Sequence, residues 1–310
     1  MSVALITHPA CLEHDTGPWH PECADRLRRV LLGLEAEEFL PLLREQAPAA
    51  TVEQLLRVHP EAHVRAILGI RPEPGESVAI DGDTVMSAGS AEAALRAAGG
   101  AVHGVDAVME GWARRAFVAV RPPGHHAERA TAMGFCLFAN AAVAARHAQA
   151  RWGLRRVAVV DFDVHHGNGT QHVFADDPDL FYASSHQYPC YPGTGAAGER
   201  GVAGNVVNAP LPPGSDGRAF RAAWSEIILP ALDAFAPELL IVSAGFDAHK
   251  ADPLAQLRLE TADFGWITER LMEVASRHCQ GRLVSVLEGG YDLDALAASA
   301  ALHVRTLLQA

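Results

Sequence analysis

Residues 157–166 read VAVVDFDVHH, so a short apolar run ends in Asp161, Asp163 and His165 at alternating positions. Such a run predicts a buried strand of a parallel sheet, and side chains two residues apart point to the same side of an extended chain. In open parallel sheets, ligands bind outside the carboxyl ends of the strands. A single Asp at this place is as often a helix cap or a turn residue. Three such side chains in alternation favour a metal site, and two carboxylates with an imidazole suit zinc.

A second apolar run, at 239–243, is followed by Asp247. Together with Asp163 and His165, Asp247 makes a set of three protein ligands. Catalytic zinc sites have three protein ligands and leave a position open for water or substrate, whereas closed structural sites use cysteine. The sequence therefore predicts a catalytic metal rather than a structural one.

The remaining pattern predicts an α/β fold with a parallel sheet. Short apolar runs alternate with helical stretches, and no linker, repeat or low-complexity block interrupts the 310 residues, so we expect one domain over 1–310. The strands are expected at 3–7, 117–120, 157–160, 180–183, 239–243 and 283–287. The helices are expected at 90–110, 139–151, 218–235 and 261–278. Long loops, able to form the rim of a site, are expected at 71–75, 188–204 and 209–217.

The composition narrows the cellular location and the classes of binding partner that we expect for the protein. The five Cys are odd in number and have no CxxC spacing, which argues against a disulfide framework and favours a cytoplasmic setting. No segment has the signature of a secretion signal or of a membrane span. The formal net charge of −12 argues against nucleic-acid binding and favours encounter with cationic partners, although an acidic surface is also ordinary.

Two further constellations follow predicted strands. Residues 121–126 read RPPGHH, and the Pro-Pro-Gly sequence restricts the loop that carries His125 and His126. An imidazole can take a proton from water and return one to a leaving nitrogen, and Asp161 can orient one of the two rings. Residues 288–291 read EGGY, in which the two glycines, Gly289 and Gly290, allow a close approach of the loop to the metal and Tyr291 can donate its hydroxyl to a developing oxyanion.

Taken together, these motifs resemble the zinc-dependent histone deacetylases and their bacterial relatives, which include acetylpolyamine amidohydrolases. The resemblance extends from His14 to about Thr306. It rests on five motifs in order: RPPGHH at 121–126, GFCLFAN at 134–140, DFDVHHGNGTQ at 161–171, SAGFDAH at 243–249 and EGGY at 288–291. It implies the arginase-deacetylase fold, a single domain around a central, mostly parallel sheet of about eight strands flanked by helices.

The resemblance also implies roles for individual residues. The zinc ligands match Asp163, His165 and Asp247, and Fe2+ suits the same donor set. The general base and acid matches His126, while His125 with Asp161 matches the neighbouring charge-tuning imidazole. The phenol that polarises the carbonyl matches Tyr291, and Asn168 stands where some members have a second Asp. The substrate-binding positions match Gly134, Phe135, Tyr191, Leu254 and Gly289, with Tyr191 replacing the more usual Phe.

Potassium and product sites are implied as well. An inner structural K+ site matches Asp161, Asp163, His165, Ser184 and Ser185. An outer site matches Phe174, Asp177, Leu180 and Asn205. Arg26 matches an arginine that lines an internal channel for the acetate product.

The implied reaction is hydrolysis of an N-acyl amide to an amine and a short carboxylate. Leu254 favours acyl-lysine in proteins or peptides, because polyamine-selective relatives place a Glu at this position to attract a second ammonium. Acetylated polyamines remain an alternative class of substrate, since the acidic Glu13 and Asp15 near the amino terminus can reach the rim of the site. A noncatalytic acyl-lysine binding module and a two-metal ureohydrolase are further alternatives. A homo-oligomer is compatible with the sequence.

Overall fold

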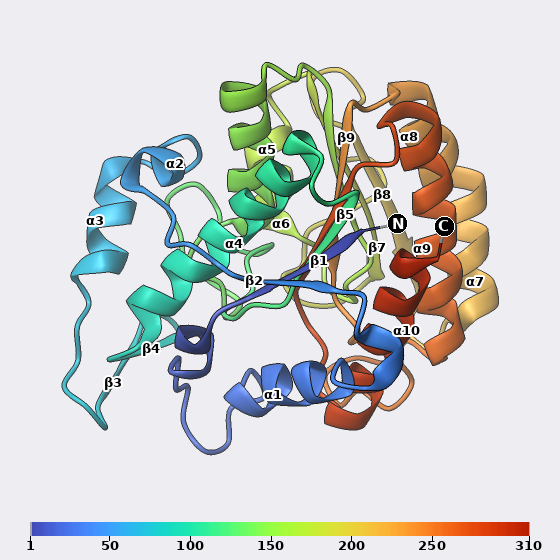
Figure 1. The fold of residues 1–310 in the computed structure, drawn as a ribbon. Coiled ribbons are helices and arrows are strands. Elements are labelled where there is room, and N and C mark those ends of the chain that lie inside the picture. The colour runs from blue at the N-terminus through green and yellow to red at the C-terminus, as the bar shows by residue number, and fades with distance from the viewer. Residues whose placement is uncertain (1, 310) are drawn as a thin grey trace.

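The core of the protein is an eight-stranded sheet, seen in a computed structural model that describes residues 2–309 (Figure 1). The strand order is β2-β1-β5-β10-β9-β6-β7-β8. All neighbouring strands pair in parallel, so the sheet is wholly rather than mostly parallel. The strands are β1 (Val3–Thr7), β2 (Leu43–Gln46), β5 (Arg115–Val118), β6 (Val157–Asp161), β7 (Leu180–Gln187), β8 (Val206–Leu211), β9 (Leu239–Ala244) and β10 (Leu283–Leu287). The expected α/β fold is confirmed.

Burial explains why the central strands form. Every residue of β5, β6, β9 and β10 is buried, because helices cover both faces of the sheet. These strands are therefore mostly apolar on both faces and do not alternate between apolar and polar residues.

Four sequence predictions need correction. The strand expected at 180–183 extends to Gln187 as β7. The strand expected at 117–120 lies at Arg115–Val118, and its charged first residue is buried because the Arg115 guanidinium donates to the carbonyl oxygen of Gln309 at 2.8 Å. The loop expected at 209–217 begins inside β8, an edge strand that tolerates Pro210. The helix expected at 218–235 contains a π-helical turn at Trp224–Ile228, next to Pro230, which has no N–H to donate.

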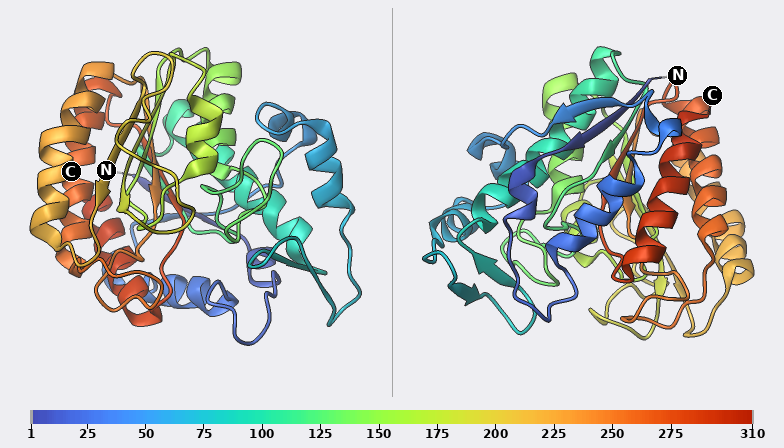
Figure 2. Two further views of the ribbon diagram at one scale, coloured as in Figure 1. Left: turned by 180° about the vertical axis from the view of Figure 1, so that it is seen from behind. Right: turned by 60° about the horizontal axis from the view of Figure 1, so that its bottom comes forward.

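The helices form two layers on the sheet. Helices α4 and α5 cover one face, and α8, α9 and α10 cover the other, with α1 packed on α10 (Figures 1 and 2). The helices are α1 (Ala24–Gly33), α2 (Val52–Leu56), α3 (Glu61–Gly69), α4 (Ser90–Glu110), α5 (Asn140–Trp152), α6 (Asn168–Phe174), α7 (Gly217–Ala223), α8 (Leu229–Phe235), α9 (Thr261–His278) and α10 (Leu293–Leu308). None of the helices within residues 2–309 combines the length and apolar character that crossing a membrane requires.

The loops that leave the carboxyl ends of β5, β6, β9 and β10 meet at one edge of the sheet. A small antiparallel hairpin, β3 (Ser77–Ala79) and β4 (Val85–Ser87), lies apart from the main sheet. Its turn is tied to the loop before α1, because His20 Nε2 donates to the carbonyl oxygen of Asp83 at 2.9 Å. These segments surround the candidate site.

Candidate metal centre and active site

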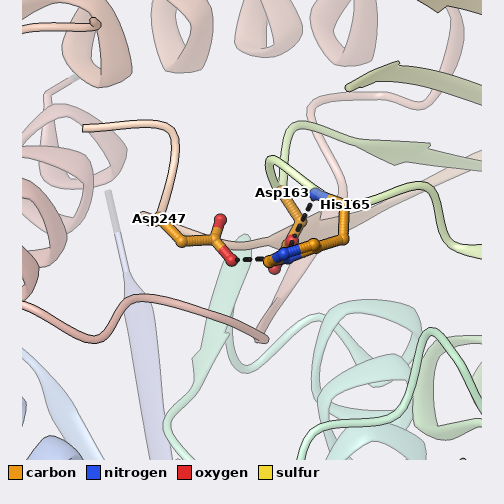
Figure 3. A group of neighbouring side chains, drawn as sticks. All are labelled: Asp163, His165 and Asp247. Carbon is orange, nitrogen blue, oxygen red and sulfur yellow. Dashed lines mark hydrogen bonds and ion pairs between the residues drawn. The ribbon is translucent and has the colours of Figure 1, made fainter. Parts of the chain in front are cut away.

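Three predicted ligands converge at the ends of two neighbouring strands. Asp163 and His165 follow β6, and Asp247 follows β9, which pairs with β6 (Figure 3). His165 Nδ1 lies 3.2 Å from Asp163 Oδ1 and 3.1 Å from Asp247 Oδ2. One donor atom of each residue lies within 4.8 Å of the other two, and all three residues are buried. This spacing allows one metal ion to contact all three side chains.

Backbone N–H groups hold the two carboxylates in place. Val164 N–H donates to Asp247 Oδ1 at 2.8 Å, and Gly289 N–H donates to Asp163 Oδ2 at 2.8 Å. A side chain at Gly289 would overlap the carboxylates of Asp247 and Asp163. The first Gly of EGGY is therefore required because the loop after β10 lies directly against the ligands.

The charges of the cluster fit a divalent cation. Burial and the negative charge of Asp163 raise the pKa of Asp247 to about 7, so the two carboxylates repel one another when no cation lies between them. A cation bound by these oxygens and by His165 relieves that repulsion. Two carboxylates and an imidazole form an N/O donor set that suits Zn2+ and Fe2+, and three protein ligands leave a position for water.

Two adjacent imidazoles next to the cluster differ in charge. His125 Nδ1 lies 2.9 Å from Asp161 Oδ2. Burial alone lowers the pKa of His125, but the charges of Asp163 and Asp161 outweigh it and raise that pKa to about 10. By contrast, burial and the positive charges of His125 and His165 lower the pKa of His126. In the absence of a bound cation, His125 is therefore cationic and His126 is neutral near pH 7.

The tautomer of His126 follows from its partner. His126 Nδ1 lies 2.8 Å from Asn168 Oδ1, while the Asn168 amide nitrogen donates to Glu128 Oε1 at 2.9 Å. The Asn168 oxygen is thus the acceptor, and Nδ1 of neutral His126 carries the proton. Nε2 remains free to accept one.

A narrow cavity of about 220 Å³ leads to these residues. Its walls include the predicted positions Gly134, Phe135, Tyr191 and Leu254, together with Tyr291. The Tyr191 ring meets His126 edge to face at 5.1 Å, and Phe135 meets Tyr291 at 5.9 Å. Flat aromatic walls of this kind fit an unbranched aliphatic chain.

Asp83 also lines the cavity, and the sequence reasoning did not select it. Its place in the turn between β3 and β4 could be read from the Asp-Gly pair at 81–82, but its position at the cavity depends on contacts between distant segments. The cavity mouth therefore carries one carboxylate in addition to its apolar walls.

Arg26 lies behind Tyr291 and is fully buried. Its guanidinium donates to the carbonyl oxygens of Gly290 at 2.6 Å and Glu288 at 2.5 Å, and it lies 4.8 Å from the centre of the Tyr291 ring. Glu22, which the sequence reasoning also missed, accepts a further hydrogen bond from Arg26 at 2.9 Å. These contacts fix the loop that carries Tyr291, while a role of Arg26 in acetate exit stays a prediction.

The residues matched to potassium sites lie next to this region. Ser184 on β7 is in register with Asp161, and Ser185 Oγ accepts a hydrogen bond from Trp224 at 2.9 Å. At the outer site, three carbonyl oxygens converge on Asn205 Nδ2, at distances of 2.9 to 3.0 Å. They belong to Phe174, Asp177 and Leu180. The amide nitrogen occupies the centre of this group, so a cation there requires Asn205 to move.

Comparison with known proteins agrees with the geometry. The profile described as Histone deacetylase domain matches residues 20–307. "Histone deacetylase 14, chloroplastic" of Arabidopsis thaliana is 40% identical over 93% of this chain and 73% of its own length. "Histone deacetylase-like amidohydrolase" of Pseudomonas aeruginosa is 40% identical over 93% of this chain and 81% of its own length. The crystal structure of the HDA15 HD domain superposes with a TM-score of 0.90 at 36% identity, covering 99% of this chain and 89% of that one.

Proposed function

Because the chain belongs to the histone deacetylase family, and is thereby a deacetylase that acts on amides, we propose that it removes acetyl or other short acyl groups from lysine side chains of peptides or proteins. The observation that carries this proposal is the narrow aromatic cavity that ends at the cluster of Asp163, His165 and Asp247. The aliphatic stem of an acyl-lysine fits between the walls formed by Phe135 and Tyr191. Its amide then lies beside His126 and Tyr291.

The proposed resident metal is zinc, and Fe2+ is the alternative that the donor set also accepts. When bound, such an ion lowers the pKa of water and polarises the amide carbonyl. Asp163, His165 and Asp247 hold it. Structural potassium is a further part of the proposal, as is a cytoplasmic location, which agrees with five cysteines that are all free thiols.

The chain's own residues divide the proton transfers between them. His126 acts through Nε2, the ring nitrogen left free by the contact of Nδ1 with Asn168: it takes the proton of the attacking water and later returns one to the leaving amine. His125, whose Nδ1 pairs with Asp161 Oδ2, is the neighbouring imidazole that stabilises the negative charge developing nearby. Tyr291 donates its hydroxyl to the oxyanion of the tetrahedral carbon. Arg26 keeps the Tyr291 loop in position through the carbonyls of Gly290 and Glu288.

The first test is the Tyr291→Phe variant. Loss of one oxyanion donor lowers kcat by about a hundredfold or more, because the hydroxyl acts mainly in the transition state. The assay is steady-state turnover of an acetyl-lysine peptide. Tyr188→Phe, the same change at a partly exposed tyrosine of the loop at 188–204, serves as the matched control and keeps wild-type turnover. Equal turnover by Tyr291→Phe and wild type would remove Tyr291 from the mechanism.

Metal removal provides a second test. A chelator should abolish turnover, and added Zn2+ should restore it. Asp247→Asn should lower the metal content from one equivalent per chain, because it removes one of two anionic ligands. Elemental analysis of purified wild type and variant measures this directly. Full metal retention by Asp247→Asn would contradict the assigned ligand set.

Acetylated polyamines are the second candidate substrate, and the carboxylate of Asp83 at the cavity mouth favours them. The apolar Leu254 at the same mouth favours acyl-lysine instead. Turnover of an acetyl-lysine peptide beside N8-acetylspermidine and acetylputrescine separates the two. A higher kcat/KM for the polyamines would overturn the peptide assignment.

A further inference from the structure

A second hollow, of about 480 Å³, lies beside the mouth of the catalytic cavity. We call it the side hollow. Its floor and walls are formed by Pro18, Trp19, His20, Pro21, Asp83 and Phe135. Phe135 and Asp83 line the catalytic cavity as well, so the two spaces share a wall. A molecule that extends beyond the catalytic cavity therefore meets the side hollow.

Trp19 is the unusual member of this surface, because its side chain is 94% exposed. The loop that carries it is nevertheless well fixed. Thr16 Oγ1 donates to the carbonyl oxygen of Glu22 at 2.6 Å, which closes the loop at its base. His20 Nε2 donates to the carbonyl oxygen of Asp83, and its ring meets Phe135 edge to face at 4.7 Å. The indole is thus presented on a preorganised loop, which reduces the entropy cost of binding.

The charge beside this indole is negative. Asp83 lies at the boundary of the two spaces, and Thr84 Oγ1 donates to its Oδ1 at 3.0 Å, which leaves acceptor capacity on the carboxylate. Among the residues that the structure places in the lining, there is no Lys or Arg. An aromatic face next to a carboxylate attracts a cation, and a guanidinium can stack on the ring while pairing with the acid.

We propose that the side hollow is a subsite for a positively charged side chain, preferably arginine, that flanks the acyl-lysine of a peptide substrate. The proposal rests on the proposed lysine deacylase function and adds a sequence preference to it. Trp19 stacks on the guanidinium, and Asp83 neutralises it. Both residues act on the choice of substrate rather than on the bond that is cleaved.

The test compares acetyl-lysine peptides that differ only in one flanking residue, which is arginine or its neutral analogue citrulline. The quantity measured is the ratio of kcat/KM for the arginine peptide to kcat/KM for the citrulline peptide. Wild type should favour arginine by about threefold to tenfold, the scale of one exposed cation–π contact plus one surface ion pair. Trp19→Ala and Asp83→Asn should each move the ratio toward one.

Leu40→Ala is the matched control for removal of an exposed apolar side chain. Leu40 is 74% exposed and precedes β2, at the end of the sheet opposite the catalytic cavity. This variant should keep the wild-type ratio. Thermal unfolding of each variant shows that it is folded, so a changed ratio reports on binding.

The possible outcomes separate the two proposals. Turnover of a minimal acetyl-lysine amide together with a ratio of one in wild type overturns the subsite alone. No turnover of any acetyl-lysine substrate overturns the proposed function as well. If Trp19→Ala lowers kcat/KM equally for the arginine and citrulline peptides, the contact is apolar and the cationic assignment is wrong. If Trp19→Ala lowers kcat/KM for N8-acetylspermidine more than for the arginine peptide, the subsite belongs to a polyamine instead.

Discussion

The adjacent histidines His125 and His126 illustrate what a sequence motif can and cannot predict. The pair and its strand-end position predict acid–base chemistry, and Asp161 could be named as an orienting partner. The different charge states depend on distances across the fold, 2.9 Å to Asp161 and 2.8 Å to Asn168. The same holds for Asp83 and Glu22, which carry no motif signal because their roles arise from contacts with distant segments.

Asn205 offers a prediction about stability. The two N–H groups of its amide are shared among three carbonyl oxygens within hydrogen-bond distance, and Asn205→Ala removes both donors. The carbonyl oxygens of Phe174 and Asp177 keep backbone donors from Asp177 and Leu180, so the free energy of unfolding should fall by only about 1 to 3 kcal/mol. Denaturant unfolding in potassium-free buffer measures this loss.

Asn205→Asp is the informative companion variant. It places carboxylate oxygens against the same carbonyls, so it should be at least as unstable as Asn205→Ala without potassium and should gain stability when potassium is added. An Asn205→Ala variant as stable as wild type would show that the contacts of the Asn205 amide with these carbonyls contribute little.

Helix α1 shows how one element supports the site from outside it. Its Arg26 reaches the loop after β10, and the preceding Glu22 accepts hydrogen bonds from Arg26 at 2.9 Å and from Arg121 at 2.7 Å. Two guanidinium groups thus share one carboxylate, and all three side chains are fully buried. Burial alone raises the pKa of Glu22, but the charges of Arg121 and Arg26 outweigh it and hold that pKa at about 2.

Glu22→Gln should therefore destabilise the protein by about 3 to 5 kcal/mol, because it leaves buried positive charge uncompensated. It should also lower kcat, since the Tyr291 loop loses part of its support. Chemical unfolding and turnover are the measurements. Glu53→Gln removes the exposed ion pair with Arg57 and is expected to cost about 1 kcal/mol or less. Equal losses of unfolding free energy in Glu22→Gln and Glu53→Gln would show that the buried network stabilises the fold no more than an exposed ion pair does.

The elements that the sequence could predict are those with a clear apolar signature. Helices α4 and α9 have the bounds expected from their patterns, 90–110 and 261–278. Strand β2 was missed because all of its residues, Leu43-Arg44-Glu45-Gln46, are exposed at the sheet edge. Strand β8 was missed because it lies at the other edge and contains Pro210. Exposure removes the apolar signal at β2, whereas at the largely buried β8 the polar Asn208 and Pro210 interrupt it.

Buried histidines affect the molecule as a whole. Burial is the main cause that lowers the pKa of several of them. It lowers that pKa to about 4 for His14, His59 and His166, and to about 3 for His186 and His303. In the unfolded chain each takes up a proton near pH 6.5. Between that pH and the lowered pKa the unfolded state binds more protons, so stability falls as the pH falls. The fold should therefore be sensitive to mild acid.

His303 allows this linkage to be isolated, because it lies inside the core within hydrogen-bond distance of the uncharged Thr268 and Ser285 and is not among the predicted metal ligands. His303→Gln removes the titrating group and keeps a polar side chain. Below pH 6.5 wild type should lose about 1.4 kcal/mol of unfolding free energy per pH unit relative to the variant, because only wild type has a histidine that the unfolded chain protonates first. Denaturant unfolding of both proteins from pH 7.5 to 4.5 measures the difference. At pH 7.5 the unfolding free energies of the two proteins should differ only through altered hydrogen bonds and packing. If that difference stays constant as the pH falls, His303 is protonated equally in the folded and unfolded states.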